Sequence, residues 1–105
     1  MKRYRTNDLN KKLELQKVIK IEDGAGGFNV SWEKVKDVWG KVELLSNITN
    51  KNFDILELKA THLIVVRRLN NININMRFIY NDVIYVIKYI NNLDNYFTEI
   101  ICEEG

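Results

Sequence analysis

Apolar and polar residues alternate with a period of two along most of this 105-residue chain. Such alternation is typical of strands that bury one face and leave the other in water. The clearest case spans residues 72–80, where the alternating apolar residues are Ile72, Ile74, Met76, Phe78 and Tyr80. Similar patterns over residues 13–21 and 38–44 predict two earlier strands. The chain is therefore expected to be mainly β.

Three further strands are expected over residues 63–69, 83–90 and 96–103. Residues 83–90 are apolar on both faces, which predicts a central strand. Asn81-Asp82 precedes it and predicts a tight hairpin, because both residue types tolerate positive φ. Residues 49–60 are the only helix candidate, although their pattern also permits a strand. Six strands and one short α-helix in a chain of this length predict a small β-barrel or sandwich.

Two glycine features interrupt the strand pattern. Residues 23–27, Asp-Gly-Ala-Gly-Gly, predict a long Gly-rich loop that is mobile in the isolated chain. Gly40 lies within an expected strand, which indicates a bulge or a close approach of another backbone. Its neighbour Trp39 is expected to anchor either the core, together with Phe78 and Tyr85, or the packing of the barrel against the helix. Replacing Trp39 by Ala is then expected to cost about 3–5 kcal/mol.

Length and composition favour one domain. We expect a basic N-terminal arm at residues 1–10 and a single barrel domain at residues 11–105. The longest purely apolar run, Leu63 to Val66, is too short to span a membrane. The basic N-terminus has no apolar stretch behind it, so no secretory signal is expected. Cys102 is the only cysteine, which excludes an internal disulfide and favours a reducing compartment.

Charge is distributed unevenly along the chain, although the net charge is only +2. Residues 1–20 contain seven Lys or Arg and two acidic residues, a balance of +5. Residues 94–105 contain four acidic residues and no basic one, a balance of −4. Opposite fields at the two ends could steer neighbouring copies together head to tail, or the ends could simply be solvated.

The residues of enzyme and cofactor sites are missing from the sequence. His62 is the only histidine, so neither a His-based metal cluster nor a nucleophile backed by several histidines is expected. At the junction between the expected helix and the next strand, His62 is expected to be a surface or capping residue, whereas Cys102 is expected in the core. The Gly-rich segment lacks the Lys-Ser/Thr of a phosphate-binding loop. We therefore expect no catalysis, no metal and no cofactor.

Nucleic-acid binding is a separate possibility, because basic and aromatic residues are interleaved in the second half of the chain. A barrel that binds single strands uses this mixture. The alternative is that the rings face the core, and the RNP motif is absent. The residues concerned are Arg67, Arg68, Arg77 and Lys88 with Phe78, Tyr80, Tyr85 and Tyr89.

Five short motifs follow one another in a specific order and spacing. They are Asp23…Gly26-Gly27 with Trp32, then Val38-Trp39-Gly40-Lys41-Val42, a strand ending at Arg67, Met76-Arg77-Phe78-Ile79-Tyr80, and the hairpin into Val83–Ile87. Over residues 11–105 this order resembles the head–tail joining (head closure, or stopper) proteins of long-tailed bacteriophages and prophages. The chain departs from their pattern in Gly40 for Ala, Asn81-Asp82 for a turn glycine, and the lack of proline after the second strand.

The resemblance implies a small β-barrel with a long loop and one helix, several copies of which form a ring in the virion neck. Its partners would be further copies, the portal or adaptor protein of the head, and a tail completion or tail-tube protein. Packaged double-stranded DNA would pass through without sequence recognition. The protein would be made in the bacterial host cytoplasm, with no membrane, cofactor or catalysis involved.

Partner surfaces are expected at both basic and loop positions. Two alternatives stay open: a small β-barrel module that binds nucleic acid or another protein, and a subunit of the tail or baseplate. The residues expected to contact partners are Arg3, Arg5, Asp23, Gly26, Gly27, Phe28, Trp32, Arg67 and Arg77.

Overall fold

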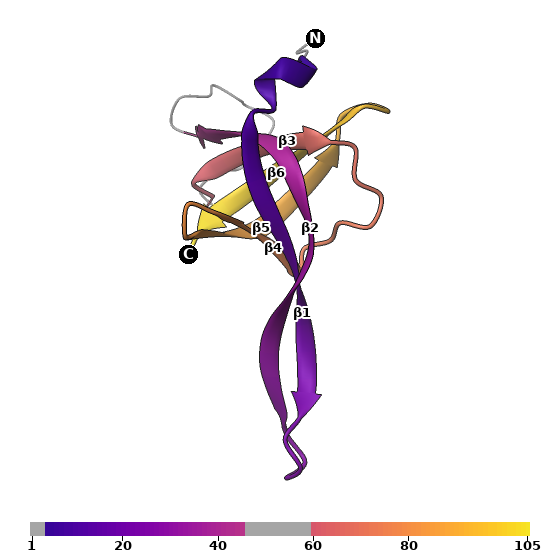
Figure 1. The fold of residues 1–105 in the computed structure, drawn as a ribbon, viewed down its shortest axis with the longest axis vertical. Coiled ribbons are helices and arrows are strands. Elements are labelled where there is room, and N and C mark those ends of the chain that lie inside the picture. Colours follow the sequence, from indigo (N-terminus) through magenta and orange to yellow (C-terminus); the bar gives the residue numbers. More distant parts are fainter. Residues whose placement is uncertain (1–3, 46–59) are drawn as a thin grey trace.

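The structure, a computed structural model, describes residues 4–45 and 60–105 (Figure 1). Six antiparallel strands close into a barrel in the order β1-β2-β3-β6-β5-β4. A one-turn 3-10 helix, Thr6–Asp8, precedes them. The strands are β1 Lys11–Glu22, β2 Phe28–Leu44, β3 His62–Arg67, β4 Met76–Tyr80, β5 Val83–Asn92 and β6 Phe97–Glu104. The prediction of a mainly β, six-stranded barrel is confirmed, and the helix expected over 49–60 lies outside the described residues apart from Ala60.

The barrel closes where β1 meets β4, through the pairs from Glu14↔Ile79 to Lys17↔Met76. Inward-facing side chains of all six strands fill its interior. Phe78 is fully buried and Tyr85 almost so, which confirms both as core residues. Cys102 is also fully buried, as expected, and burial raises the pKa of its thiol. The buried core consists of Leu13, Leu15, Ile64, Val66, Leu69, Met76, Phe78, Tyr85, Ile87, Ile100 and Cys102.

A second apolar cluster covers the outside of β3 and β6. Tyr4 and Leu9 pack there with Leu45, Leu63, Val65 and Ile101. The Tyr4 hydroxyl donates a 2.6 Å hydrogen bond to the buried Glu99 carboxylate. The pKa of Tyr4 is raised, first by burial and second by this hydrogen bond. Because β3 is covered on both faces, His62 is buried. Its ring packs edge-on against the ring of Tyr85, with the two ring centroids 5.0 Å apart. The expectation of a surface or capping histidine was therefore wrong.

Strands β1 and β2 continue well beyond the barrel. Within the described chain, Val18–Glu22 and Phe28–Trp32 pair only with each other, because β1 leaves β4 at Lys17 and β2 meets β3 only from Gly40. Figure 1 shows the two strands twisting about each other as they leave the barrel. We call residues 18–32 the projecting hairpin. It lengthens the molecule to 52 × 29 × 25 Å.

Several predicted strand limits and orientations were wrong. β2 begins at Phe28, not at residue 38, and continues to Leu44 past an extra residue opposite the Leu15/Gln16 junction of β1. β4 begins only at Met76, because the Asn73 carbonyl and side chain accept hydrogen bonds that form a turn; Ile74 is 62% exposed. β5 is paired on both edges, but Val86 and Tyr89 on its outer face are exposed. The turn at Asn81-Asp82 is confirmed by φ angles of 51° and 64°.

Trp39 was expected in the core but lies on the outside of the barrel, 57% exposed. Its neighbours Val38 and Gly40 face inward, so the alternation of β2 directs Trp39 outward beside Lys12. Gly40 confirms the expected close approach. A Cβ there would lie 2.5 Å from Leu13 Cδ1 and 3.0 Å from the Val65 carbonyl oxygen.

Candidate assembly surfaces

The tip of the projecting hairpin is a turn organised by one carboxylate. Asp23 Oδ1 accepts the backbone N–H groups of Ala25 at 2.8 Å and Gly27 at 3.0 Å. These two bonds hold the pKa of Asp23 below its ordinary value. Gly24 and Gly26 adopt φ angles of 80° and 87°, which favour glycine. The structure thus brings together Asp23, Gly26 and Gly27, three of the expected contact residues.

The same geometry determines what valine at Gly26 and Gly27 would do. A Cβ at Gly27 would lie 2.9 Å from Asp23 Oδ2, and Gly26 already has positive φ in the single chain. Valine at these positions would therefore distort the tip before any assembly takes place. The mobility expected for this loop stays a prediction.

Apolar side chains line one face of the projecting hairpin. Phe28, Val30 and Trp32 of β2 share this face, and the first two are 65% and 61% exposed. Their partners in β1 are Glu22, Lys20 and Val18. Phe28 and Trp32 were expected contact residues. The sequence analysis missed Val30, although its alternation with those two residues was a usable signal.

Arg77 connects the base of the projecting hairpin to the barrel. Its guanidinium carbon lies 4.1 Å from the centroid of the Trp32 ring, and its Nε donates a 2.7 Å hydrogen bond to Gln16 Oε1. A cation over an indole face is an attractive contact. Trp32 and Arg77 were both expected to meet partners, but here they contact each other. Their structural effect is to fix the direction in which the hairpin leaves the barrel.

The stacking surface considered for nucleic acid is not assembled. Phe78 and Tyr85 lie in the core, and Lys88 Nζ lies 3.2 Å from a Glu103 carboxylate oxygen. The Arg77 guanidinium already lies over the Trp32 ring and donates a hydrogen bond to Gln16. Bases stack on exposed rings beside accessible cations, so burial of two of the four rings removes the surface that this hypothesis requires.

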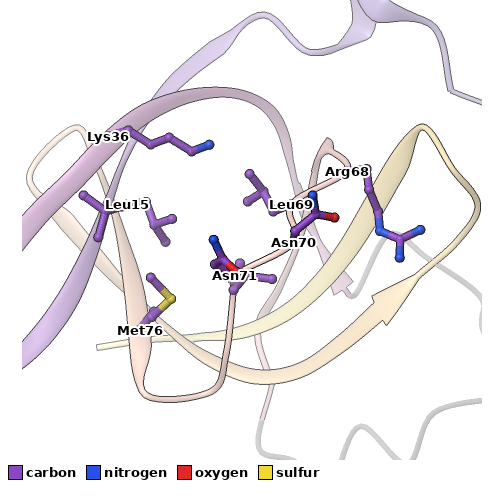
Figure 2. A pocket seen from close by; sticks show the side chains of 9 residues that line it. Leu15, Lys36, Arg68, Leu69, Asn70, Asn71 and Met76 are labelled. Atoms are coloured by element: carbon purple, nitrogen blue, oxygen red, sulfur yellow. The ribbon is translucent and has the colours of Figure 1, made fainter.

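Two adjacent hollows lie where the projecting hairpin joins the barrel. The first, of about 240 Å³, is drawn in Figure 2, where Leu15 and Lys36 come from β1 and β2, and Leu69, Asn70 and Asn71 from the β3–β4 connection. The second, of about 280 Å³, lies on the Trp39 side. We call the two together the basal groove. Its lining residues are Leu15, Val35, Lys36, Asp37, Val38, Trp39, Arg67, Arg68, Leu69, Asn70, Asn71, Ile72 and Met76.

The remaining expected contact residues lie apart from the hairpin tip. Arg67 lines the basal groove beside Arg68, whose Nη1 donates a 2.7 Å hydrogen bond to the Asp94 carbonyl. Arg5 is exposed at the N-terminal end, which Figure 1 shows opposite the hairpin tip, and its backbone N–H donates to Asp8 at 3.0 Å. Arg3 lies outside the described residues. The expected residues therefore fall on separate surfaces.

Neither a metal cluster nor a membrane helix occurs in the described parts of the chain. Residues 4–45 and 60–105 contain no group of three His, Cys, Asp or Glu side chains placed to hold a metal ion. They also contain no helix long and apolar enough to cross a bilayer.

Comparison with known proteins gives a family match and several structural likenesses, of which two are described. A family model described as phage head completion protein matches residues 4–105. A chain in the structure titled virion of native gene transfer agent particle shares 24% identity and a TM-score of 0.70, with 98% of each chain covered. Protein SF1141 from Shigella flexneri 2a shares 18% identity and a TM-score of 0.74, with 97% of each covered. At these identities the two structures establish the fold alone. No curated protein matches.

Proposed function

This chain belongs to the phage head completion protein family, and from that membership we propose that several copies form a ring in the virion neck. The role of the protein is structural, in joining a phage head to its tail, and its place is in the virion. The proposed ring lies under the portal or its adaptor, continues the DNA channel, helps to retain the packaged genome and offers a face to the tail.

The projecting hairpin is the observation that best supports a ring. Its strands extend about 17 Å past the barrel, taking five residues at roughly 3.4 Å each. The two shorter dimensions of the molecule are 29 and 25 Å. A hairpin of this reach spans more than half of a neighbouring barrel. Its exposed Phe28, Val30 and Trp32 then gain cover that the single chain does not give them.

The contacts in such a ring are heterologous, because the hairpin of one copy meets a different surface on the next. Heterologous contacts close into a ring when the rotation between copies suits. Each contact is modest in area, so we expect the isolated protein to be monomeric and to assemble on the head, where neighbouring sites raise the effective concentration.

Each part of the chain has a proposed place in this assembly. Residues 11–105 are the assembling domain and residues 1–10 a basic N-terminal arm, of which Tyr4 and Leu9 are anchored on the barrel. Asp23, Gly26, Gly27 and Phe28 form the contact tip. DNA passes through the ring without sequence recognition. Synthesis takes place in the host cytoplasm, and no catalytic step is proposed.

The test is to add the purified protein to DNA-filled heads made without it. We expect several copies to bind each head, with recovery of DNA retention and of tail joining. In the assembled state, amide exchange at residues 22–28 should slow relative to the monomer. Phe28→Asp should reduce binding about tenfold or more, because it places a charge in an apolar contact.

A matched control for Phe28→Asp is Tyr89→Asp, which alters an exposed aromatic residue on the outer face of β5, away from both the hairpin and the basal groove. This variant should bind heads as the unaltered protein does. Absence of any multi-copy complex at every salt concentration would reject the ring. Equal amide exchange at residues 22–28 in the free and bound states would reject the role of the hairpin tip.

A further inference from the structure

We propose that the basal groove of each copy receives the acidic edge of the next copy in the ring. The acidic edge consists of Asp82, Glu103 and Glu104, at the end of the barrel opposite the groove. This inference rests on the proposed ring and names the surfaces through which neighbouring copies meet.

The basal groove carries an excess of positive charge on an apolar floor. Lys36, Arg67 and Arg68 line it and are exposed. Asp37 is the single acidic lining residue among those that the structure describes, and its carboxylate already contacts Lys34 at 3.0 Å and Lys12 at 3.8 Å. Trp39 forms one wall with its indole 57% exposed. The groove thus offers three cations and a flat apolar surface to an anionic partner.

The acidic edge is built by the ends of two elements that lie side by side. The backbone N–H of Gly105 donates a 2.8 Å hydrogen bond to the Ile84 carbonyl, which holds the end of β6 beside the turn at Asn81-Asp82. The side chain of Glu104 is half exposed, and Asp82 is exposed. Lys88 contacts Glu103 at 3.2 Å, so the edge carries three carboxylates and one cation.

Strand register places the two surfaces at opposite ends of the barrel. In the β3–β6 pair, His62 lies opposite Cys102 and Arg67 opposite Phe97. The acidic edge follows Cys102, and the basal groove begins at Arg67, five residues away along β3. At roughly 3.3 Å per residue the two surfaces are about 17 Å apart, so a single chain cannot join them. Copies arranged head to tail can join them at every interface.

The groove suits a folded protein edge better than it suits DNA. Beside its cations, the first hollow has apolar surface from Leu15, Leu69 and Met76, which a phosphodiester would not cover. Three cations neutralise few phosphates, whereas they equal three carboxylates in number and are opposite to them in charge. Opposite charge on facing surfaces also fixes the register between neighbours and rejects wrong pairings.

The experiment uses two charge-reversal variants of the full chain on heads made without it. The groove variant is Arg67→Glu with Arg68→Glu, and the edge variant is Glu103→Lys with Glu104→Lys. Each alone should bind heads at least about tenfold less well than the unaltered protein, since like charges then face each other at every contact. Mixed in equal amounts, the two should recover most of the lost binding, because alternating copies restore opposite charge at both interfaces.

The outcomes separate this proposal from the ring itself. If the unaltered protein fails to bind heads, the proposed function is rejected. If it binds and both variants bind equally well, the groove–edge contact is rejected. If only the groove variant fails, or both fail without recovery on mixing, the affected surfaces bind DNA or a head protein instead, and the contact is again rejected.

A matched control reverses a pair on the projecting hairpin side. Lys17 Nζ lies 3.4 Å from Glu33 Oε1, so Lys17→Glu with Glu33→Lys preserves both the pair and the net charge. This control should bind as the unaltered protein does. Thermal unfolding of all variants within a few degrees of the unaltered chain would show that folding is preserved.

Discussion

Strands β1 and β2 contribute to both the barrel and the projecting hairpin, but their apolar side chains are buried in the barrel and exposed in the hairpin. In the barrel, Leu13 and Leu15 of β1 are buried under five other strands. A few residues later, Ile21 continues the alternation of Leu13 and Leu15 in β1, and Phe28 belongs to an alternating run on the outer face of β2; both are more than half exposed. Alternation therefore shows that a face requires cover. It does not show whether the same chain or another supplies that cover.

The two regions also differ in what holds them. A two-stranded hairpin alone is marginally stable in water, whereas a closed barrel pairs every strand on both sides. The projecting hairpin depends on its root, where Arg77 contacts Trp32 and Gln16. Substitutions in the barrel should therefore alter global unfolding, and equivalent ones in the hairpin should alter mainly assembly.

The strongest test compares two phenylalanines. Phe78→Ala empties a fully buried site and should lower the free energy of unfolding by about 3–5 kcal/mol. Phe28→Ala removes a ring that is 65% exposed and should change the free energy of unfolding by no more than about 0.5 kcal/mol. Chemical denaturation measures both. Comparable losses of unfolding free energy from the two variants would show that the hairpin contributes to global stability as the barrel core does.

Glycine gives the next largest contrast. Gly40→Ala places a methyl group 2.5 Å from Leu13 Cδ1 and 3.0 Å from a backbone oxygen, so it should destabilise the barrel by about 1–3 kcal/mol. Gly26→Ala meets nothing within 4 Å, and its strain comes from the φ angle of 87°. That strain, of about 1–2 kcal/mol, can relax within the tip. Thermal melting should therefore shift more for Gly40→Ala, and the reverse order would contradict this account.

Trp39 tests the outer face of the barrel itself. Because the indole is 57% exposed, Trp39→Ala should cost no more than about 1 kcal/mol, well below the 3–5 kcal/mol expected for a core tryptophan. Its fluorescence should be readily quenched by iodide in the single chain and protected on heads. A large loss of stability would show that Trp39 is buried in the core after all.

The smallest expected effect concerns pH at the hairpin tip. The pKa of Asp23 is lowered in the folded chain from its ordinary 3.8 by the N–H groups of Ala25 and Gly27. The contribution of this turn is therefore complete above pH 3.8 and is lost as pH falls through the lowered pKa. Amide chemical shifts of Ala25 and Gly27 should report this midpoint by NMR. A midpoint at or above 3.8 would show that the carboxylate does not organise the tip.

Local pattern was enough to predict the barrel. Six strands, the turn at Asn81-Asp82, the close approach at Gly40 and the burial of Phe78 and Tyr85 all follow from alternation, turn chemistry or the lack of a side chain. These features depend on residues near one another in sequence. Phe78 and Tyr85 were therefore assigned to the core correctly, although several strand limits were wrong.

The projecting hairpin was hidden by a change of parity. Phe28, Val30 and Trp32 occupy even positions on the outer face of β2, but after the extra residue opposite Leu15/Gln16 the outer face passes to odd positions such as Trp39. The alternation in the sequence therefore breaks within a continuous strand. The Arg77–Trp32 contact and the burial of His62 depend on strand register and on cover from the N-terminus, neither of which local spacing encodes.

The length of β2 has a mechanical consequence. One unbroken strand runs from the hairpin tip to Leu44, and its pairing with β1 extends from Glu22↔Phe28 to Lys11↔Gly40. Tension applied at the tip pulls β1 and β2 in the same direction, so it is borne in shear by the hydrogen bonds that join β1 to β4 and β2 to β3, which lie perpendicular to the strands. Gly40–Leu44 then pass the force directly to β3. The tip thus works as the end of a stiff lever, and its displacement strains the barrel wall before the hairpin unzips.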